Sequence, residues 1–224
     1  MANLTQLSFE EWVAFVFDHP AGGQAREWYW EPDSDWWDGP AAATISLLTR
    51  AFESPQTVFA PYSDAQLNQG LWYLASNACS NHMFALTDES VPWPDRQRCL
   101  RSMVSLYAQC FARRCTPALG HLDEQPANPL NLVCYMWWDI LPVIGQPKLP
   151  ARQAFDQTCL EVMAAALALD SDACQESALH GLGHWAPYYP QQVSAIVDAY
   201  LQLPRPLRPA LQQYALSAQR GCVL

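Results

Sequence analysis

Three side chains able to bind a metal ion recur every four residues in one stretch of the sequence: Glu176, His180 and His184. On an α-helix such positions share one face within two turns. Two imidazoles at this spacing are the zinc ligands of HExxH helices, where a glutamate beside the first histidine acts as general base. Gly181 stands in place of that glutamate here. The stretch therefore supports the hypothesis of a metal-dependent helical enzyme, with His121 as a candidate fourth ligand.

The simpler interpretation of the same stretch is a closely packed helix whose histidines are hydrogen-bonded to their neighbours. Gly181 and Gly183 lie between or beside the two histidines, and glycine weakens a helix relative to alanine. A weakened helix is a poor frame for a catalytic metal. We prefer the packed helix, and we expect neither a metal ion nor another cofactor.

The sequence from Glu27 to Asp38, here called the acidic–aromatic segment, holds five acids and five large aromatic residues among twelve. Tryptophan and tyrosine are enriched among the residues that dominate protein–protein binding energies. A group of acids attracts a basic surface over long range. We therefore predict a partner-binding site made of Trp28, Trp30, Glu31, Asp33, Asp35, Trp36, Trp37 and Asp38.

Three other interpretations of the acidic–aromatic segment remain open. It could be a loop that packs its tryptophans onto the core and leaves its acids solvated. Its rings could stack on a sugar or another small ligand, and a pair of its carboxylates could even cleave a glycoside. A calcium loop fits less well: after Asp33 and Asp35 the third acid, Asp38, comes one residue late, and Thr44 stands where the closing glutamate is needed.

Other signatures of catalysis are missing from the sequence. It contains neither the Gly-x-Ser-x-Gly elbow of a nucleophilic serine nor a phosphate-binding P-loop. Cys79 and His82 could form a thiol–imidazole pair, but their spacing is common by chance. Of the neighbouring Trp137 and Trp138 we expect one ring in the core; the other could line a groove between helices, but we prefer core packing. We therefore expect a protein that is not an enzyme.

The charge of the chain limits its partners. The net charge is −10 over 224 residues, and residues 1–62 contain nine acids against two bases. Nucleic acids are bound by Lys and Arg that neutralise phosphates, so we expect no nucleic-acid partner. An anionic membrane surface is disfavoured for the same reason. A partner protein is expected to be basic and to meet the N-terminal quarter; the sequence leaves the oligomeric state open.

Hydrophobic patterning argues for a cytoplasmic protein. No stretch approaches the roughly 18–20 apolar residues needed to span a bilayer. Residues 1–10 lack the basic and apolar regions of a secretory signal. The eight cysteines are spread along a chain with ample apolar material for a core. We therefore expect buried, reduced thiols rather than disulfides.

Helical signals dominate the chain. Ser8 with Glu11, and Ser63 with Gln66, are capping-box pairs, each followed by apolar residues at helical spacing. The last helix is expected to stop at Gly221. Short proline-containing connections favour antiparallel neighbours. We predict one all-α domain over residues 1–224, built from stacked antiparallel helical hairpins, with a loop at about 20–40. The expected helices cover about 9–19, 40–52, 63–78, 94–114, 128–140, 152–169, 172–185, 190–200 and 209–220.

Part of the chain resembles a known repeat. In residues 174–185, Ala178, Leu179, Leu182 and Gly183 match the Ala-Leu-x-x-Leu-Gly pattern of HEAT-like repeats of the bacterial lyase type. The resemblance implies an irregular α-solenoid or bundle that acts as a scaffold or binding surface. Cys99–Met103 and Cys159–Met163 are also similar, which hints at an internal repeat offset by about 60 residues.

These observations favour a protein-interaction module. Its most specific form is a bacterial immunity protein, a small acidic cytoplasmic protein that covers the basic working surface of a toxin. The first alternative is the metal-dependent enzyme using Glu176, His180 and His184. The second is a sugar-binding or other small-ligand protein using the acidic–aromatic segment.

Overall fold

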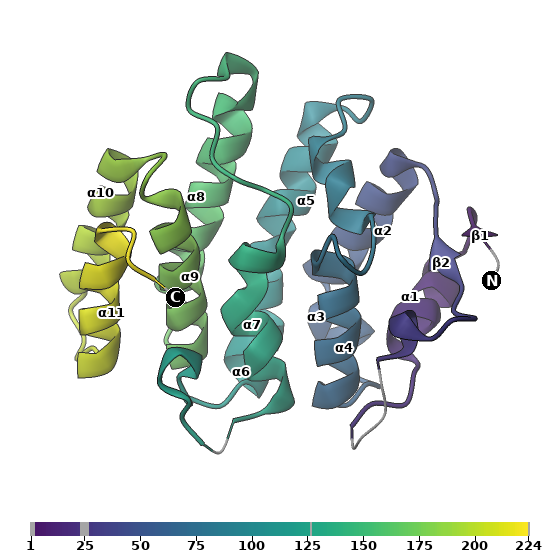
Figure 1. The fold of residues 1–224 in the computed structure, drawn as a ribbon, viewed down its shortest axis with the longest axis horizontal. Helices are drawn as coiled ribbons and strands as arrows, with labels where there is room; N and C mark the ends of the chain where they lie inside the picture. Colours follow the sequence, from purple (N-terminus) through teal and green to yellow (C-terminus); the bar gives the residue numbers. More distant parts are fainter. Residues whose placement is uncertain (1–2, 23–26, 126, 224) are drawn as a thin grey trace. The chain divides into compact units, whose positions relative to one another are not determined.

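The computed structural model describes residues 3–22, 27–125 and 127–223. These residues form eleven α-helices and only two short strands of two residues each (Figure 1). The predicted all-α fold is confirmed. Within the described ranges, no helix combines the length and the apolar character that a membrane crossing requires.

The chain divides into two compact units, and the single domain over residues 1–224 stays a prediction. Residues 1–110 and 140–142 form the first unit, and residues 111–139 and 143–224 form the second. The acidic–aromatic segment lies in the first unit, and both histidines of the 180–184 pair lie in the second.

The first unit holds the acidic–aromatic segment. Its helix α2 packs against α5, and α1 packs against α4. The strand β1 pairs in parallel with β2. In chain order its elements are β1 (Asn3–Leu4), α1 (Phe9–Phe17), the 3-10 turn η1 (Trp28–Trp30), β2 (Trp36–Trp37), α2 (Ala41–Glu53), α3 (Pro55–Val58), α4 (Asp64–Ala75), the 3-10 segment η2 (His82–Thr87) and α5 (Trp93–Leu106).

Both predicted capping boxes are present in the first unit. The Ser8 hydroxyl accepts from the backbone N–H of Glu11, whose carboxylate accepts from the N–H of Ser8. Ser63 and Gln66 make the same reciprocal pair at the start of α4. Each box satisfies two of the N–H groups that a helix start leaves without an intrahelical partner.

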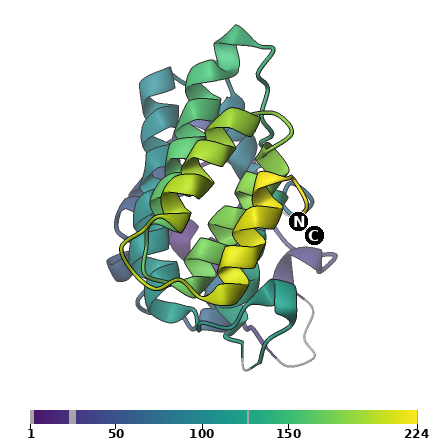
Figure 2. The ribbon, with the colours of Figure 1, turned by 90° about the vertical axis from the view of Figure 1, so that its left-hand side faces the viewer.

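The second unit contains the histidine-bearing helix. Consecutive helices from α8 to α11 run alternately up and down, as Figures 1 and 2 show, and the pairs α8–α9, α9–α11 and α10–α11 are in contact. Its elements are α6 (Ala112–Arg114), the 3-10 turn η4 (Gly120–Leu122), α7 (Pro129–Ile140, whose last residue belongs to the first unit), the 3-10 turn η5 (Pro150–Arg152), α8 (Gln153–Leu167), α9 (Asp172–Trp185), α10 (Pro190–Leu201) and α11 (Pro209–Gln219).

Helix α9 is the central element of the second unit. It is buried on almost every side, and His184 is the exposed position before its final tryptophan. Gly181 allows close contact with α7, because a Cβ atom there would lie 2.6 Å from Cγ of Trp138. The hydroxyl of Ser177 donates to the backbone oxygen of Cys134 on the same neighbour. Small residues thus let α9 approach α7 closely at these two points.

Some local expectations were confirmed and others were wrong. The predicted helix over 94–114 is helical throughout, with a π-helical segment, Tyr107–Phe111, between α5 and α6. Trp137 and Trp138 are both buried, as the preferred interpretation of core packing expected. Leu132, expected in the core, is 54% exposed. The predicted loop at 20–40 contains η1 and β2, while its residues 23–26 lie outside the described ranges.

Candidate functional site

The acidic–aromatic segment is held against the first unit by backbone pairing. Trp36 and Trp37 form β2 and pair with Asn3 and Leu4. The N–H of Asp38 donates to the backbone oxygen of Leu4 over 2.9 Å. A long-range strand pair fixes this end of the segment in one conformation, which the sequence did not predict.

Two of the four tryptophans in the predicted site face inward. Trp28 is 9% exposed and stacks on His19, with ring centroids 4.1 Å apart. Its ring also lies 4.6 Å from that of Tyr73. Trp37 is 5% exposed and donates its indole N–H to the hydroxyl of Thr44 over 2.8 Å. Trp28 and Trp37 therefore anchor the segment to its own unit, and we withdraw them from the predicted contact surface.

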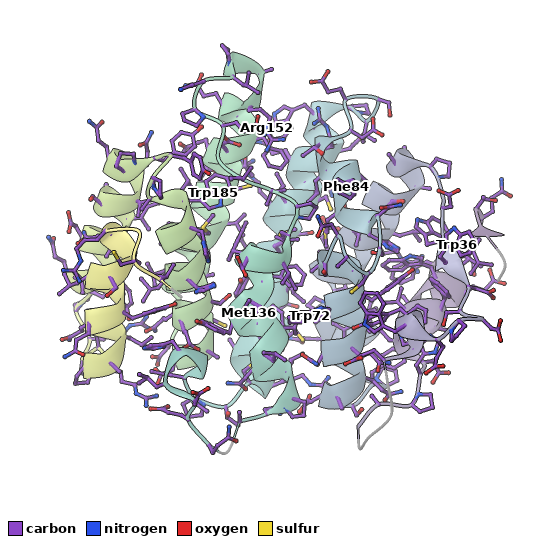
Figure 3. The ribbon with its side chains drawn as sticks, in the orientation of Figure 1. Trp36, Trp72, Phe84, Met136, Arg152 and Trp185 are labelled. Carbon is purple, nitrogen blue, oxygen red and sulfur yellow. The ribbon has the colours of Figure 1, made fainter. Side chains whose placement is uncertain are left out.

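The other two tryptophans face outward. Trp30 is 41% exposed and Trp36 is 43% exposed, and Trp36 lies at the edge of the unit in Figure 3. The four acids of the predicted site are also exposed: Glu31, Asp33, Asp35 and Asp38. The segment thus presents two large apolar rings among four carboxylates, on a backbone held by two buried rings.

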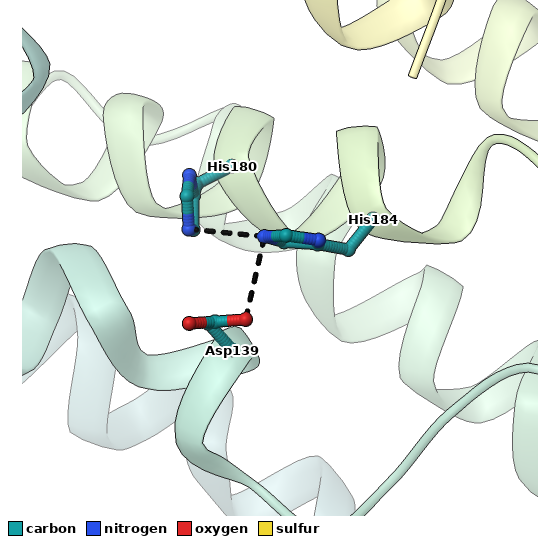
Figure 4. Close-up of side chains that lie close together, drawn as sticks. All are labelled: Asp139, His180 and His184. Carbon is teal, nitrogen blue, oxygen red and sulfur yellow. Dashed lines mark hydrogen bonds and ion pairs between the residues drawn. The ribbon is translucent and has the colours of Figure 1, made fainter. Parts of the chain in front are cut away.

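The second candidate site gathers three possible metal ligands from two helices of the second unit. His180 and His184 lie one turn apart on α9, and Asp139 is near the end of α7. Nε2 of His184 lies 3.2 Å from Nε2 of His180 and 3.4 Å from Oδ1 of Asp139. All three ligand atoms lie within 4.8 Å of one another (Figure 4). We call this group the Asp–His–His cluster.

The cluster combines a buried residue with two that reach solvent. His180 is 2% exposed, whereas the side chains of His184 and Asp139 are 40% and 41% exposed. Burial, followed by the charge of His184, lowers the pKa of His180 to about 4. The other ring nitrogen of His180, Nδ1, lies 2.8 Å from the hydroxyl of Tyr214.

Glu176 is not part of this cluster, although the sequence placed it with the two histidines. Its carboxylate is buried and accepts from the backbone N–H groups of Gly120 and His121, at 3.0 and 2.9 Å. It also lies 2.5 Å from Nδ1 of His121. Glu176 therefore holds the η4 turn, and the structure puts Asp139 where the sequence hypothesis put Glu176. His121 is likewise engaged with Glu176 and stacks on Tyr214.

The suggested thiol–imidazole pair does not form. His82 accepts the indole N–H of Trp12 on Nε2, and its Nδ1 lies 2.9 Å from the hydroxyl of Ser80. Burial raises the pKa of the Cys79 thiol. A thiol with a raised pKa and no imidazole base is a weak nucleophile, so this pair offers no catalytic site.

Comparison with known proteins gives no functional assignment. No family model, no curated protein and no solved structure matches the chain. The HEAT-like resemblance therefore stays a prediction.

Proposed function

We propose that this protein is a protein-interaction module whose contact surface is the acidic–aromatic segment. The observation that carries the proposal is the exposure of Trp30 and Trp36, at 41% and 43%, on a segment whose neighbouring rings Trp28 and Trp37 are buried. Exposed tryptophans are the side chains most enriched at binding hot spots. A surface already held in place avoids part of the ordering cost of binding.

The four acids of the segment define the chemistry of the partner. Glu31, Asp33, Asp35 and Asp38 are exposed on the same segment as the two rings, and the whole chain carries a net charge of −10. Complementary charge raises association rates and excludes acidic competitors. The partner in this proposal is a protein with a basic surface and an apolar recess for an indole ring.

In the most specific form of the proposal, the protein is a cytoplasmic bacterial immunity protein. Its partner is then a toxin whose basic working surface is covered by the segment. Inhibition is steric and electrostatic, and needs no catalytic group on this chain. The absence of a nucleophile or phosphate-binding motif from the sequence is compatible with that role.

A charge-reversal capture experiment tests the proposal. Glu31, Asp33, Asp35 and Asp38 are changed to Lys, and tagged wild type and variant are used to capture proteins from native lysate. A matched control changes four exposed acids outside the segment to Lys: Glu89, Glu161, Asp170 and Asp198. The proposal expects one basic protein that wild type and control capture and the segment variant loses.

The captured protein is then expressed with and without this chain. If the captured protein arrests cell growth, and wild type but not the segment variant relieves the arrest, the immunity role is supported. A captured protein that does not arrest growth rejects the immunity role but not the interaction. Equal capture by all three forms rejects the acidic–aromatic segment as the site. Capture of no specific protein by the folded wild type rejects the interaction proposal itself.

A further inference from the structure

We propose that the Asp–His–His cluster binds one divalent transition-metal ion, for which Zn²⁺ is the probe. The inference concerns a different unit from the acidic–aromatic segment and does not depend on the proposed function. Imidazole nitrogen and carboxylate oxygen are common zinc ligands. The cluster offers imidazole nitrogens from His180 and His184 and a carboxylate oxygen from Asp139.

The spacing of the ligand atoms fits a small tetrahedral ion. Zinc–nitrogen and zinc–oxygen bonds of about 2.0–2.2 Å place tetrahedral ligand atoms about 3.3–3.6 Å apart. The separations from Nε2 of His184 are 3.2 Å to His180 and 3.4 Å to Asp139. The third separation, between His180 and Asp139, is within 4.8 Å.

Proton counting favours a cation at the centre of the cluster. A neutral imidazole carries one N–H, so a proton on Nε2 of His184 can point at His180 or at Asp139 but cannot serve both well. When both histidines carry their proton on Nδ1, Nε2 of His180, Nε2 of His184 and Oδ1 of Asp139 present three lone pairs to one another. A metal ion binds all three lone pairs at once, which a single shared proton does not.

The hydrogen bond on the far side of His180 prepares its Nε2 to bind a metal. Nδ1 of His180 lies 2.8 Å from the hydroxyl of Tyr214. When Nδ1–H donates to that oxygen, the lone pair is on Nε2, which faces the cluster. Metal-binding histidines are usually oriented in this way by a partner on their other nitrogen. Tyr214 is therefore a positioning residue.

A close approach at Gly181 brings together the two helices that carry the ligands. Gly181 lies between the histidines in sequence, and Trp138 precedes Asp139. A Cβ atom on Gly181 would come within 2.6–2.8 Å of Trp138 side-chain atoms, so the two helices are in direct contact beside the cluster. Gly181 would weaken an isolated helix. Here its lack of a side chain lets α7 come close enough for Asp139 to reach the histidines of α9.

The cluster leaves one coordination position for a solvent or ligand molecule. Three protein ligands fill three of the four tetrahedral positions. The half-exposed side chains of His184 and Asp139 form its solvent side, while His180 forms the buried side. A metal ion can therefore enter from solvent without unfolding the unit and retain one exchangeable water.

Zinc binding by the full chain, stripped of metal with a chelator, tests the inference. Isothermal titration with Zn²⁺ is expected to give one site per chain, and Co²⁺ is expected to show the visible absorption of tetrahedral coordination. Asp139→Asn and His184→Ala alter half-exposed side chains, so both variants should remain folded. Each should lower Zn²⁺ affinity more than about a hundredfold, since even changes around the ligands cost 10–100-fold.

Matched variants separate the cluster from adventitious binding. Asp123→Asn removes an exposed carboxylate from the same unit, and His19→Ala removes a histidine from the other unit. Both should bind Zn²⁺ as wild type does. Circular dichroism spectra are compared with that of wild type to check that each variant is folded. Failure of wild type to bind one Zn²⁺ per chain, or undiminished binding by Asp139→Asn or His184→Ala, would overturn the assignment.

Discussion

Trp12 donates its indole N–H to Nε2 of His82 over 3.1 Å, and both side chains are buried. Because an indole nitrogen can only donate, Nε2 of His82 must be unprotonated in the folded protein. Its proton then lies on Nδ1, which is 2.9 Å from the hydroxyl of Ser80. One hydrogen bond thus fixes both the tautomer and the neutral state of a buried histidine.

The neutral state of His82 should make the protein sensitive to acid. Burial lowers its pKa from 6.5 to about 3 in the folded state. Between those pH values the unfolded chain binds more protons than the folded one. The contribution of neutral His82 to the free energy of unfolding is therefore complete above pH 6.5. It is lost as the pH falls from 6.5 towards about 3, by up to about 1.4 kcal/mol per pH unit.

Urea unfolding of wild type and His82→Gln at several pH values between 7 and about 4 checks this linkage. The glutamine oxygen can still accept from Trp12 but does not titrate. The variant should lose less free energy of unfolding than wild type as the pH falls. If the free energy of unfolding falls equally with pH in the two proteins, His82 is not the group that makes the protein sensitive to acid.

Removal of the donor should destabilise the first unit at neutral pH. Trp12→Phe leaves Nε2 of His82 without a partner, and an unsatisfied buried acceptor costs about 1–3 kcal/mol. The smaller ring also leaves a void, so we expect a total loss of about 3 kcal/mol or more. Trp30→Phe, at a 41% exposed position, should change the free energy of unfolding by less than about 0.5 kcal/mol. Equal effects of the two variants in urea unfolding would contradict this prediction.

The contrast between helix starts and the metal cluster shows what the sequence could predict. Ser8 and Glu11 are three residues apart, and their mutual capping depends only on local backbone geometry. The pairing of Asp139 with His184 depends on how α7 packs on α9. No local pattern of the sequence encodes that distance, so the helical spacing of Glu176 with the histidines was the only available signal.

The acidic–aromatic segment shows the same division. Its composition predicted an exposed acidic surface, and the exposure of Asp33 agrees. Which tryptophans turn inward depends on partners far along the chain: Trp28 contacts Tyr73, and Trp37 bonds to Thr44. Alternating burial of the rings could not be inferred without those contacts.

The outward and inward tryptophans of the segment should respond differently to truncation. Trp30→Ala and Trp36→Ala should leave the free energy of unfolding within about 0.5 kcal/mol of wild type. Each should weaken partner binding by about 2 kcal/mol or more, roughly thirtyfold. Trp28→Ala and Trp37→Ala should instead cost about 3–5 kcal/mol of stability.

Urea unfolding and the dissociation constant of the captured partner measure the two effects separately. Undiminished binding by both Trp30→Ala and Trp36→Ala would remove these rings from the interface. Unchanged stability of Trp28→Ala or Trp37→Ala would contradict their role as anchors.

Gly181→Ala should destabilise the second unit despite the better helix propensity of alanine. The added methyl group would meet Cγ of Trp138 at 2.6 Å, and overpacking of this kind costs about 1–3 kcal/mol. The propensity gain of about 1 kcal/mol offsets only part of that cost. Gly183→Ala is the comparison, because its close contact is Val223, a side chain outside any helix that can shift more easily than Trp138 within α7.

Thermal unfolding should therefore rank wild type above Gly183→Ala, and Gly183→Ala above Gly181→Ala. Displacement of α7 should also weaken Zn²⁺ binding in Gly181→Ala, because Asp139 follows Trp138. A Gly181→Ala protein as stable as wild type would mean that Trp138 moves aside without cost.

Tyr214→Phe tests whether the hydroxyl beside His180 acts on the metal cluster. The substitution removes the oxygen that lies 2.8 Å from Nδ1 of His180 and keeps the ring that stacks on His121 at 4.0 Å. Loss of such a partner lowers metal affinity about 10–100-fold. Tyr200→Phe is the matched control, because its hydroxyl donates to Gln175 and does not contact the cluster. In titrations with Zn²⁺, only Tyr214→Phe should show a lower affinity. An equal loss of affinity in both variants would indicate general loosening of the second unit. Unchanged affinity in both would mean that packing against Tyr135, whose ring lies 4.6 Å away, orients His180.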